Sequence, residues 1–200
     1  DVYKRQELKE QAQSSLNQKD YIKARYLFKK AYEAFATREN YPQAIESGVQ
    51  ANALYVRENF YKEGFELCRD MDQLIWAGEQ NQKKVFYDLR FLVNKERLQM
   101  YTALKNPAQA KTQLNKLEET ANLAKNDSLT EVLLYTKANY YYTFNQNTQG
   151  DACFRKLINQ YKEKKDYAKV SDCYKNLIGI ARKANNAPVS YTHLRAHETC

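Results

Sequence analysis

The residues best suited to catalysis or metal binding are two histidines, four cysteines and one close pair of aspartates. A histidine serves as a general base or metal ligand, and a cysteine as a nucleophile or zinc ligand. However, His193, His197 and Cys200 lie at the carboxyl end, in a segment that we do not expect to belong to the protein. Asp70 and Asp72 are two apart, and in a helix such side chains point to different sides, so we expect no paired-carboxylate site from them.

The two ends of the chain are related as DNA rather than as protein. Asp1–Gln6 can be written in the codons GAT GTG TAT AAG AGA CAG. The reverse complement of that string, read in another frame, encodes Val-Ser-Tyr-Thr-His, which is the run Val189–His193. Both ends resemble translated sequencing adapter. We therefore expect residues 1–6 and 188–200 to be adapter-derived and residues 7–187 to be a protein segment truncated at both ends.

The three remaining cysteines do not form a recognisable site. Cys68, Cys153 and Cys173 show no Cys-x-x-Cys spacing and have no histidine among residues 7–187 to join them, which argues against zinc. Cys153 and Cys173 could approach each other across adjacent helices, but burial as small hydrophobic residues is favoured. The glycines are isolated, so no glycine-rich loop could hold a phosphate. We expect no catalytic residue, no metal and no cofactor here, and predict that the segment is not an enzyme.

Composition favours a helical protein with a solvated, mixed-charge surface. Glycine and proline are scarce, and no run of eighteen apolar residues occurs that could span a bilayer. The net charge is +8, but the lysines are interspersed with acidic residues, as in Lys162–Asp166. Such mixing favours an ordinary hydrated surface over a phosphate-binding patch, so no nucleic-acid partner is expected.

Short polar breaks divide the sequence into helices. Asp20 and Asp166 each precede a helical pattern, and Asn106 is followed by Pro107, a residue favoured in the first turn of a helix. Ser128–Glu131 has the form of a capping box. These side chains would accept hydrogen bonds from backbone N–H groups that a new helix leaves unpaired, so each predicts a helix start.

The second helix of each expected hairpin repeats one pattern of side chains. Four positions are spaced by three, four and three residues, and the second is always small, which would let two helices approach closely. The small residue recurs at intervals of 40, 46 and 40. The first helices share a pattern of a large residue, a small one and an aromatic one, which is clearest at Leu134, Ala138 and Tyr141. We take Tyr141 as the core residue. The four copies are Tyr21, Ala24, Phe28, Ala31; Tyr61, Gly64, Cys68, Met71; Pro107, Ala110, Leu114, Leu117; and Asn147, Gly150, Phe154, Leu157.

Together with the break Lys19-Asp20-Tyr21, this ladder resembles the tetratricopeptide repeat, a helix hairpin of about 34 residues. The resemblance covers residues 7–187 as four hairpins and one half. It implies an all-α fold, an α-solenoid of antiparallel helix hairpins with four and a half repeats. The units are longer than in the family, and its tryptophan and Leu-Gly pair are missing. The alternative is a helical bundle without repeats.

The half repeat predicts an uncovered apolar surface. In a solenoid each repeat buries its face on its neighbours, and here the partner helix would follow the end of the segment. The helix after Asp166 carries one apolar stripe, which we expect to be left open. Its members are Val170, Cys173, Tyr174, Leu177 and Ile180.

The resemblance implies a partner-binding surface on the first helices, on the concave side of the superhelix. The candidates face away from the ladder, and their tyrosine and asparagine side chains suit recognition. Tyr135 and Tyr142 could equally pack between adjacent helices. The candidate residues are Lys95, Gln99 and Thr102 in the third hairpin and Tyr135, Asn139 and Tyr142 in the fourth.

Function is expected to be the binding of a protein or peptide partner. The runs Lys95–Tyr101, Leu133–Phe144 and Ser171–Leu177 look like repeat arrays that precede a membrane helix and a kinase or regulator module in bacterial signalling proteins. That resemblance implies a periplasmic sensing region, membrane-anchored when intact. The alternatives are a freestanding cytoplasmic adaptor and, more remotely, a nucleic-acid-binding helical repeat. The partner and the oligomeric state are not specified by the sequence.

Overall fold

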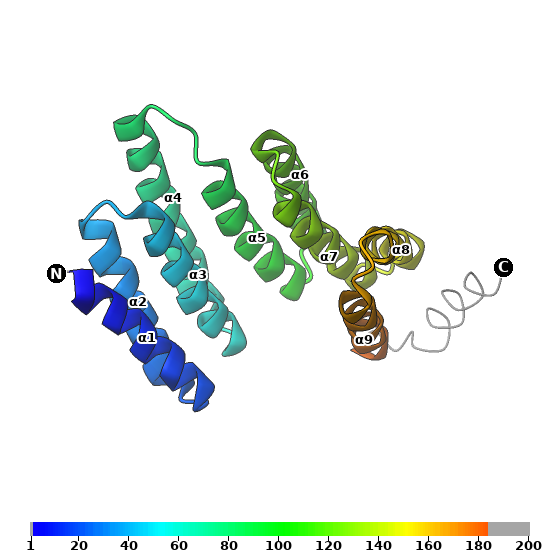
Figure 1. Ribbon diagram of the computed structural model, residues 1–200, viewed down its shortest axis with the longest axis horizontal. Helices are drawn as coiled ribbons and strands as arrows, with labels where there is room; N and C mark the ends of the chain where they lie inside the picture. The colour runs from blue at the N-terminus through cyan, green and yellow to red at the C-terminus, as the bar shows by residue number, and fades with distance from the viewer. Residues whose placement is uncertain (1, 184–200) are drawn as a thin grey trace.

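The computed structural model describes residues 2–183, which form nine helices joined by short turns (Figure 1). No β-strand occurs in this part of the chain. The expected adapter-derived residues 188–200, with both histidines and Cys200, lie outside the described residues. The helices are α1 (Val2–Asn17), α2 (Tyr21–Thr37), α3 (Tyr41–Arg57), α4 (Tyr61–Gln82), α5 (Tyr87–Ala103), α6 (Pro107–Ala124), α7 (Asp127–Thr143), α8 (Asn147–Glu163) and α9 (Tyr167–Lys183).

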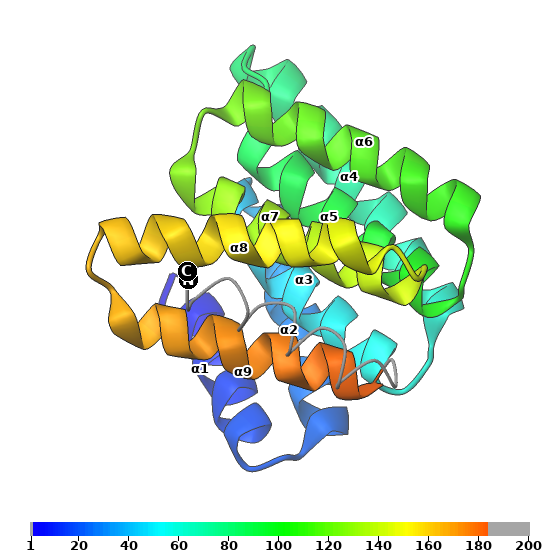
Figure 2. The same cartoon turned by 90° about the vertical axis from the view of Figure 1, so that its right-hand side faces the viewer.

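The helices stack as a twisted row of antiparallel hairpins. Each packs mainly on the helix next to it in sequence, and α3, α5, α7 and α9 also touch one another in succession. Helices α8 and α9 are seen nearly end on in Figure 1 but lie lengthwise in Figure 2, so the row turns as it proceeds. This arrangement confirms the predicted α-solenoid of helix hairpins. Of the helices that the structure describes, none is long and apolar enough to cross a membrane.

Each turn between helices contains one residue in the left-handed conformation. Lys19 has φ 62°, and its N–H and that of Asp20 donate to the carbonyl oxygens of Leu16 and Ser15 at 3.0 and 2.9 Å. This closes the end of α1 in the manner of a Schellman turn. Lysine, glutamate and asparagine occupy this position, although glycine adopts the conformation at lower cost. The remaining seven are Glu39, Asn59, Lys83, Lys105, Lys125, Asn145 and Lys165.

Polar caps begin most of the helices, as predicted. The side chains of Asp20, Asn106 and Asp166 each accept a hydrogen bond from the N–H three residues later, at 3.2 Å. The expected capping box at Ser128–Glu131 is wrong. Helix α7 begins at Asp127, and the side chain of Asn126 accepts the N–H of Ser128 at 3.0 Å. Asparagine is the stronger capping residue, so the helix begins earlier than the Ser-x-x-Glu pattern indicated.

The ladder lies in the core between the helices. Ala24 and Ala110 are fully buried, and a Cβ added at Gly150 would lie 2.7 Å from the ring of Tyr142. This approach explains why small residues recur at these positions. All three cysteines among the described residues are buried and free, as expected.

The apolar stripe of α9 is covered rather than open, so that expectation was wrong. Cys173 and Leu177 are almost completely buried, and Val170 is 8% exposed. They pack with Leu134, Phe154 and other residues of α7 and α8 in one hydrophobic cluster. The stripe faces the preceding hairpin because α9 stacks on α7 as α7 stacks on α5.

One helix departs from the regular length. Helix α4 has 22 residues, whereas α2, α3, α5, α7, α8 and α9 have 17. Residues 83–86 then connect α4 to α5, and Phe86 packs against Tyr41, with ring centroids 5.7 Å apart. The longer interval of 46 in the sequence ladder therefore reflects an extended α4 and its connection.

Candidate functional site

The predicted partner-binding residues of α5 and α7 divide into open and buried positions. Gln99 and Asn139 are exposed, and Lys95 is half-buried. These three lie on the first helices of their hairpins, and their role in binding a partner stays a prediction.

Thr102 and Tyr142 must be removed from that surface. Thr102 is 3% exposed, and its hydroxyl donates to the carbonyl oxygen of Leu98 at 2.7 Å. Tyr142 is 1% exposed and donates to a carboxylate oxygen of Asp151. Burial, followed by this hydrogen bond, raises the pKa of Tyr142 well above its usual range. Neither side chain is accessible to a partner.

Tyr135 packs against neighbouring helices, the alternative that the sequence had left open. It is half-buried, its hydroxyl lies 2.9 Å from the Sγ of Cys173, and its ring meets Phe154 edge-on at 5.5 Å. The prediction that Tyr141 is the core residue was wrong by one position along the helix. Tyr142 is deeply buried, while Tyr141 is only partly covered, because Tyr142 shares the helical face of Ala138 at a spacing of four.

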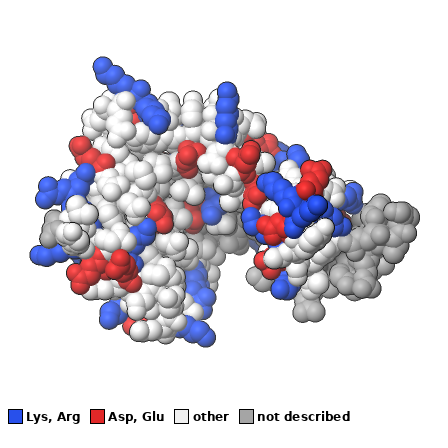
Figure 3. Space-filling view, in the orientation of Figure 1, with Lys and Arg blue, Asp and Glu red and all other residues white. Residues whose placement is uncertain are grey.

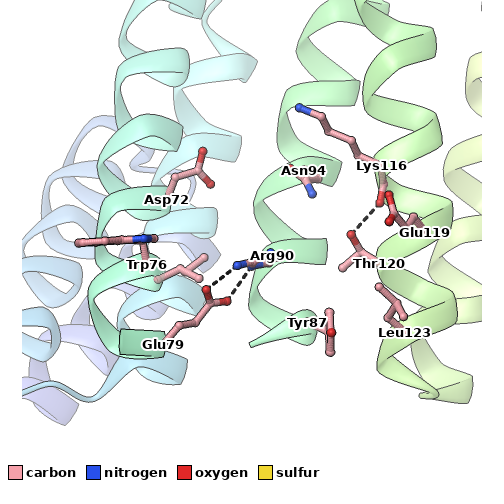
Figure 4. A pocket seen from close by; sticks show the side chains of 11 residues that line it. Asp72, Trp76, Glu79, Tyr87, Arg90, Asn94, Lys116, Glu119, Thr120 and Leu123 are labelled. Atoms are coloured by element: carbon pink, nitrogen blue, oxygen red, sulfur yellow. Dashed lines mark hydrogen bonds and ion pairs between the residues drawn. The ribbon is translucent and has the colours of Figure 1, made fainter. Parts of the chain in front are cut away.

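A groove that the sequence did not predict lies on another side of α5. It is bounded by α4 and α6, has α5 as its floor and encloses about 450 Å³ (Figure 4). Each helix contributes one face. The lining residues are Asp72, Ile75, Trp76 and Glu79 from α4, Tyr87, Arg90 and Asn94 from α5, and Lys116, Glu119, Thr120 and Leu123 from α6.

An ion pair closes the floor of the groove. Glu79 is almost completely buried and receives two hydrogen bonds from Arg90, at 2.6 Å from Nε and 2.5 Å from Nη2. Its Oε1 also accepts the backbone N–H of Phe86 at 3.0 Å, so one carboxylate joins the end of α4 to the start of α5. Burial opposes ionisation, but the hydrogen bonds from Arg90 and Phe86 outweigh it and lower the pKa of Glu79. Figure 4 shows the two side chains pointing toward each other from α4 and α5.

The rims of the groove carry exposed apolar side chains. Trp76, the only tryptophan, is 63% exposed on α4, and Leu123 is 49% exposed on α6. Ile75 contributes apolar surface beneath Trp76 and is itself buried. The groove therefore offers hydrophobic contact above a floor of paired charges.

The charges of the two walls differ in whether they are already paired. Asp72 forms an ion pair with Arg97 of α5, and Glu79 is paired with Arg90. In contrast, Lys116 and Glu119 on α6 form no ion pair or side-chain hydrogen bond within residues 2–183. The α6 wall thus presents one free cation and one free anion, three residues apart.

A second hollow of about 730 Å³ adjoins the first. It lies between the α2–α3 turn and residues 84–89, and Tyr87 lines both hollows. Val85 is 39% exposed there. Helix α4 therefore borders both concave regions, and its connection to α5 borders the second.

Charge is mixed on the face shown in Figure 3, in line with the interspersed charges of the sequence. Acidic and basic side chains alternate on the face shown in Figure 3, without a continuous basic stripe. In the described residues, no group of histidine, cysteine, aspartate and glutamate side chains has the geometry to hold a metal ion. Comparison of the chain with protein-family models, with curated proteins and with solved structures found no match.

The sequence did contain two signs of the groove. The ladder interval of 46 marked the place where the repeat is interrupted, and Trp76 stood outside every ladder position. Neither sign was sufficient, because the groove depends on how far α4 and α6 stand apart, which only the packing of α5 between them determines.

Proposed function

We propose that this chain is a non-catalytic helical-repeat scaffold, similar to tetratricopeptide repeats, that binds a polypeptide partner in the groove between α4 and α6. The observation that carries the proposal is the 63% exposure of Trp76 at the rim, with Leu123 on the opposite wall. Tryptophan is enriched among the residues that dominate binding energy at protein interfaces. A partner that covered both side chains would remove a large apolar area from water.

The groove is large enough to hold a ligand, and its walls are rigid. About 450 Å³ lies within the range of roughly 300–1,000 Å³ typical of ligand sites. Its walls are helices packed on a solenoid, which holds the binding residues in fixed positions. Gln99, Asn139 and Lys95 remain available as a separate contact surface on the first helices.

The proposal can be tested by selecting binders from a phage-displayed library of random linear peptides. We expect peptides that bind the intact chain and shift the emission of Trp76 to shorter wavelength, because this single tryptophan reports on the groove. Trp76→Ala should weaken binding of a labelled peptide at least about tenfold, measured by fluorescence anisotropy. Tyr26→Ala is the control, since Tyr26 is 61% exposed on α2 and does not line the groove. Equal loss in both variants, or in neither, would show that the peptide binds elsewhere.

The position of the scaffold in a larger protein is a separate part of the proposal. We propose that it is the sensing or partner-binding region of a bacterial signalling protein, on the resemblance of three of its runs to such arrays. Recovery of the coding sequence on both sides of residues 7–187 tests this. A membrane helix followed by a kinase or regulator module is expected, and a stop codon after one closing helix would support the freestanding adaptor instead.

A further inference from the structure

The groove between α4 and α6 specifies the form of its partner. We propose that it receives one face of an amphipathic helix, with apolar side chains that cover Trp76 on the α4 wall and Leu123 on the α6 wall, and with one acidic and one basic residue facing Lys116 and Glu119. This inference rests on the proposed function and adds the conformation and charge pattern of the ligand.

The walls have the spacing of helix-to-helix packing. On α4 the lining residues are Asp72, Ile75, Trp76 and Glu79, and on α6 they follow the same spacing of three, one and three. Each wall is therefore a single helical face about two turns long, roughly 10 Å at 1.5 Å per residue. A helix laid above α5 would meet both walls and complete a four-helix arrangement, the type of packing already used throughout the solenoid.

The volume fits one face of a helix rather than a whole one. A two-turn helix about 10 Å in diameter would fill roughly 800 Å³. The groove holds about 450 Å³ and is open to solvent on its outer side. The buried part of the ligand would thus be the side chains of one face, while its other face remains in water.

The backbone of the groove walls disfavours an extended peptide. An extended chain leaves its backbone N–H and C=O groups to be satisfied by the site, as a sheet edge does. Here the walls are helices whose backbone groups are bonded internally. The hydroxyl of Thr120 is also used, because it donates to the carbonyl oxygen of Lys116 at 2.6 Å. Asn94 is the one amide side chain of the lining. A helix satisfies its own backbone and needs no such groups.

The charges of the groove define the polar residues of the ligand. Arg97 and Arg90 neutralise Asp72 and Glu79 from within the chain, so the α4 wall requires no countercharge. Lys116 and Glu119 lack partners among the described side chains and lie about one helical turn apart. An acid and a base about one turn apart on the ligand would match both.

The test compares two displayed libraries, one of linear random peptides and one of helical peptides randomised at positions i, i+3, i+4 and i+7. We expect the helical library to yield the tighter binders, with an apolar residue and an acid–base pair on the randomised face. A proline at the centre of a selected peptide should abolish binding, because it breaks the helix.

A charge exchange in the protein tests the pairing directly. In the double variant Lys116→Glu with Glu119→Lys, a selected peptide should bind about tenfold or more weakly, and the same peptide with its acid and base exchanged should recover most of that loss. Both side chains are exposed, so thermal unfolding followed by circular dichroism should be unchanged. If linear peptides bind through Trp76 and tolerate the proline, the helical inference is overturned and the proposed function stands. If neither library yields binders that depend on Trp76, both are overturned.

Discussion

Replacing Glu96 with glutamine should stabilise the protein at neutral pH. Glu96 is 3% exposed between α3 and α5, and its carboxylate accepts one hydrogen bond, from the Nδ2 of Asn52 at 3.0 Å. Asn52 is fully buried, and its Oδ1 has no hydrogen-bond partner. Burial raises the pKa of Glu96, although the hydrogen bond from Asn52 and the charge of Lys95 partly oppose the shift. A negative charge at this position is therefore unfavourable, and an acceptor beside it is unsatisfied.

The sign of the pH dependence follows from the raised pKa. The unfolded chain releases the proton near pH 4.5, while the folded chain retains it to higher pH. The buried carboxyl of Glu96 therefore costs the protein no stability below pH 4.5. The free energy of unfolding then falls as pH rises through the folded pKa. Glutamine carries no charge at any of these pH values, and its amide can donate to Oδ1 of Asn52. At pH 4 the protonated carboxyl of Glu96 can donate its own O–H to Oδ1 of Asn52, so glutamine has an advantage only where Glu96 is charged. Satisfying one buried polar group is worth about 1–3 kcal/mol, so we expect Glu96→Gln to stabilise by that amount at pH 7 and by little at pH 4.

Urea unfolding at several pH values between 4 and 8 measures this difference. Circular dichroism monitors the whole chain during unfolding, and Trp76 fluorescence monitors α4. Glu66→Gln is the control, because Glu66 is an exposed carboxylate on α4 and should show no such trend. A Glu96→Gln variant that is less stable than the parent at pH 7, with the deficit vanishing in acid, would show that folding lowers the pKa of Glu96 and that the reasoning is wrong.

Four further substitutions test other parts of the structure. Glu79→Gln should destabilise the protein by about 1–2 kcal/mol at pH 7, measured by urea unfolding. Because folding lowers the pKa of Glu79, this difference between variant and parent should disappear as pH falls below 4.5. The pH trend is thus opposite to that expected at Glu96. Lys19→Gly should raise the free energy of unfolding by about 0.5–1 kcal/mol in the same assay, since glycine adopts a positive φ without the steric cost; no gain would mean that the turn is not strained. Gly150→Ala should destabilise by about 1–3 kcal/mol because its methyl group would press on the ring of Tyr142. Gly179→Ala, which meets nothing within 4 Å, should instead stabilise α9 by up to about 1 kcal/mol, and equal effects at the two glycines would refute the packing argument.

The fold could be predicted because its determinants are local. Caps such as Asp20 and Asn106 act on the next turn of the chain, and the ladder of small residues recurs at a nearly fixed interval. Helix phase was harder to predict. Tyr141 and Tyr142 differ by one position, or about 100° of rotation, and only the seating of Tyr142 against Gly150 and Asp151 shows which one is buried.

Predictions that depended on contacts between distant segments were the weakest. The stripe containing Cys173 and Leu177 was correctly identified as apolar, but its partner was taken to be a following helix, whereas it is the preceding hairpin. A periodic pattern shows that a helix has a buried face and does not show which neighbour covers it. Thr102 was assigned to the open face for the same reason, although α5 contacts helices on several sides: α3, α4, α6 and α7.

The groove arises where the repeat is interrupted, and Glu79 explains why the interruption is stable. The added length of α4 carries this residue beyond the point at which most of the other helices end, and there it reaches both Arg90 and the N–H of Phe86. Phe86 cannot cap α5 with a side-chain oxygen, so the N-terminal end of α5 depends on this contact from α4. The carboxylate that pairs with Arg90 in the groove therefore also fixes the connection between α4 and α5. Because the remaining repeats hold α5 and α6 in place, the interruption can alter the surface at this one position without disturbing the stacking on either side.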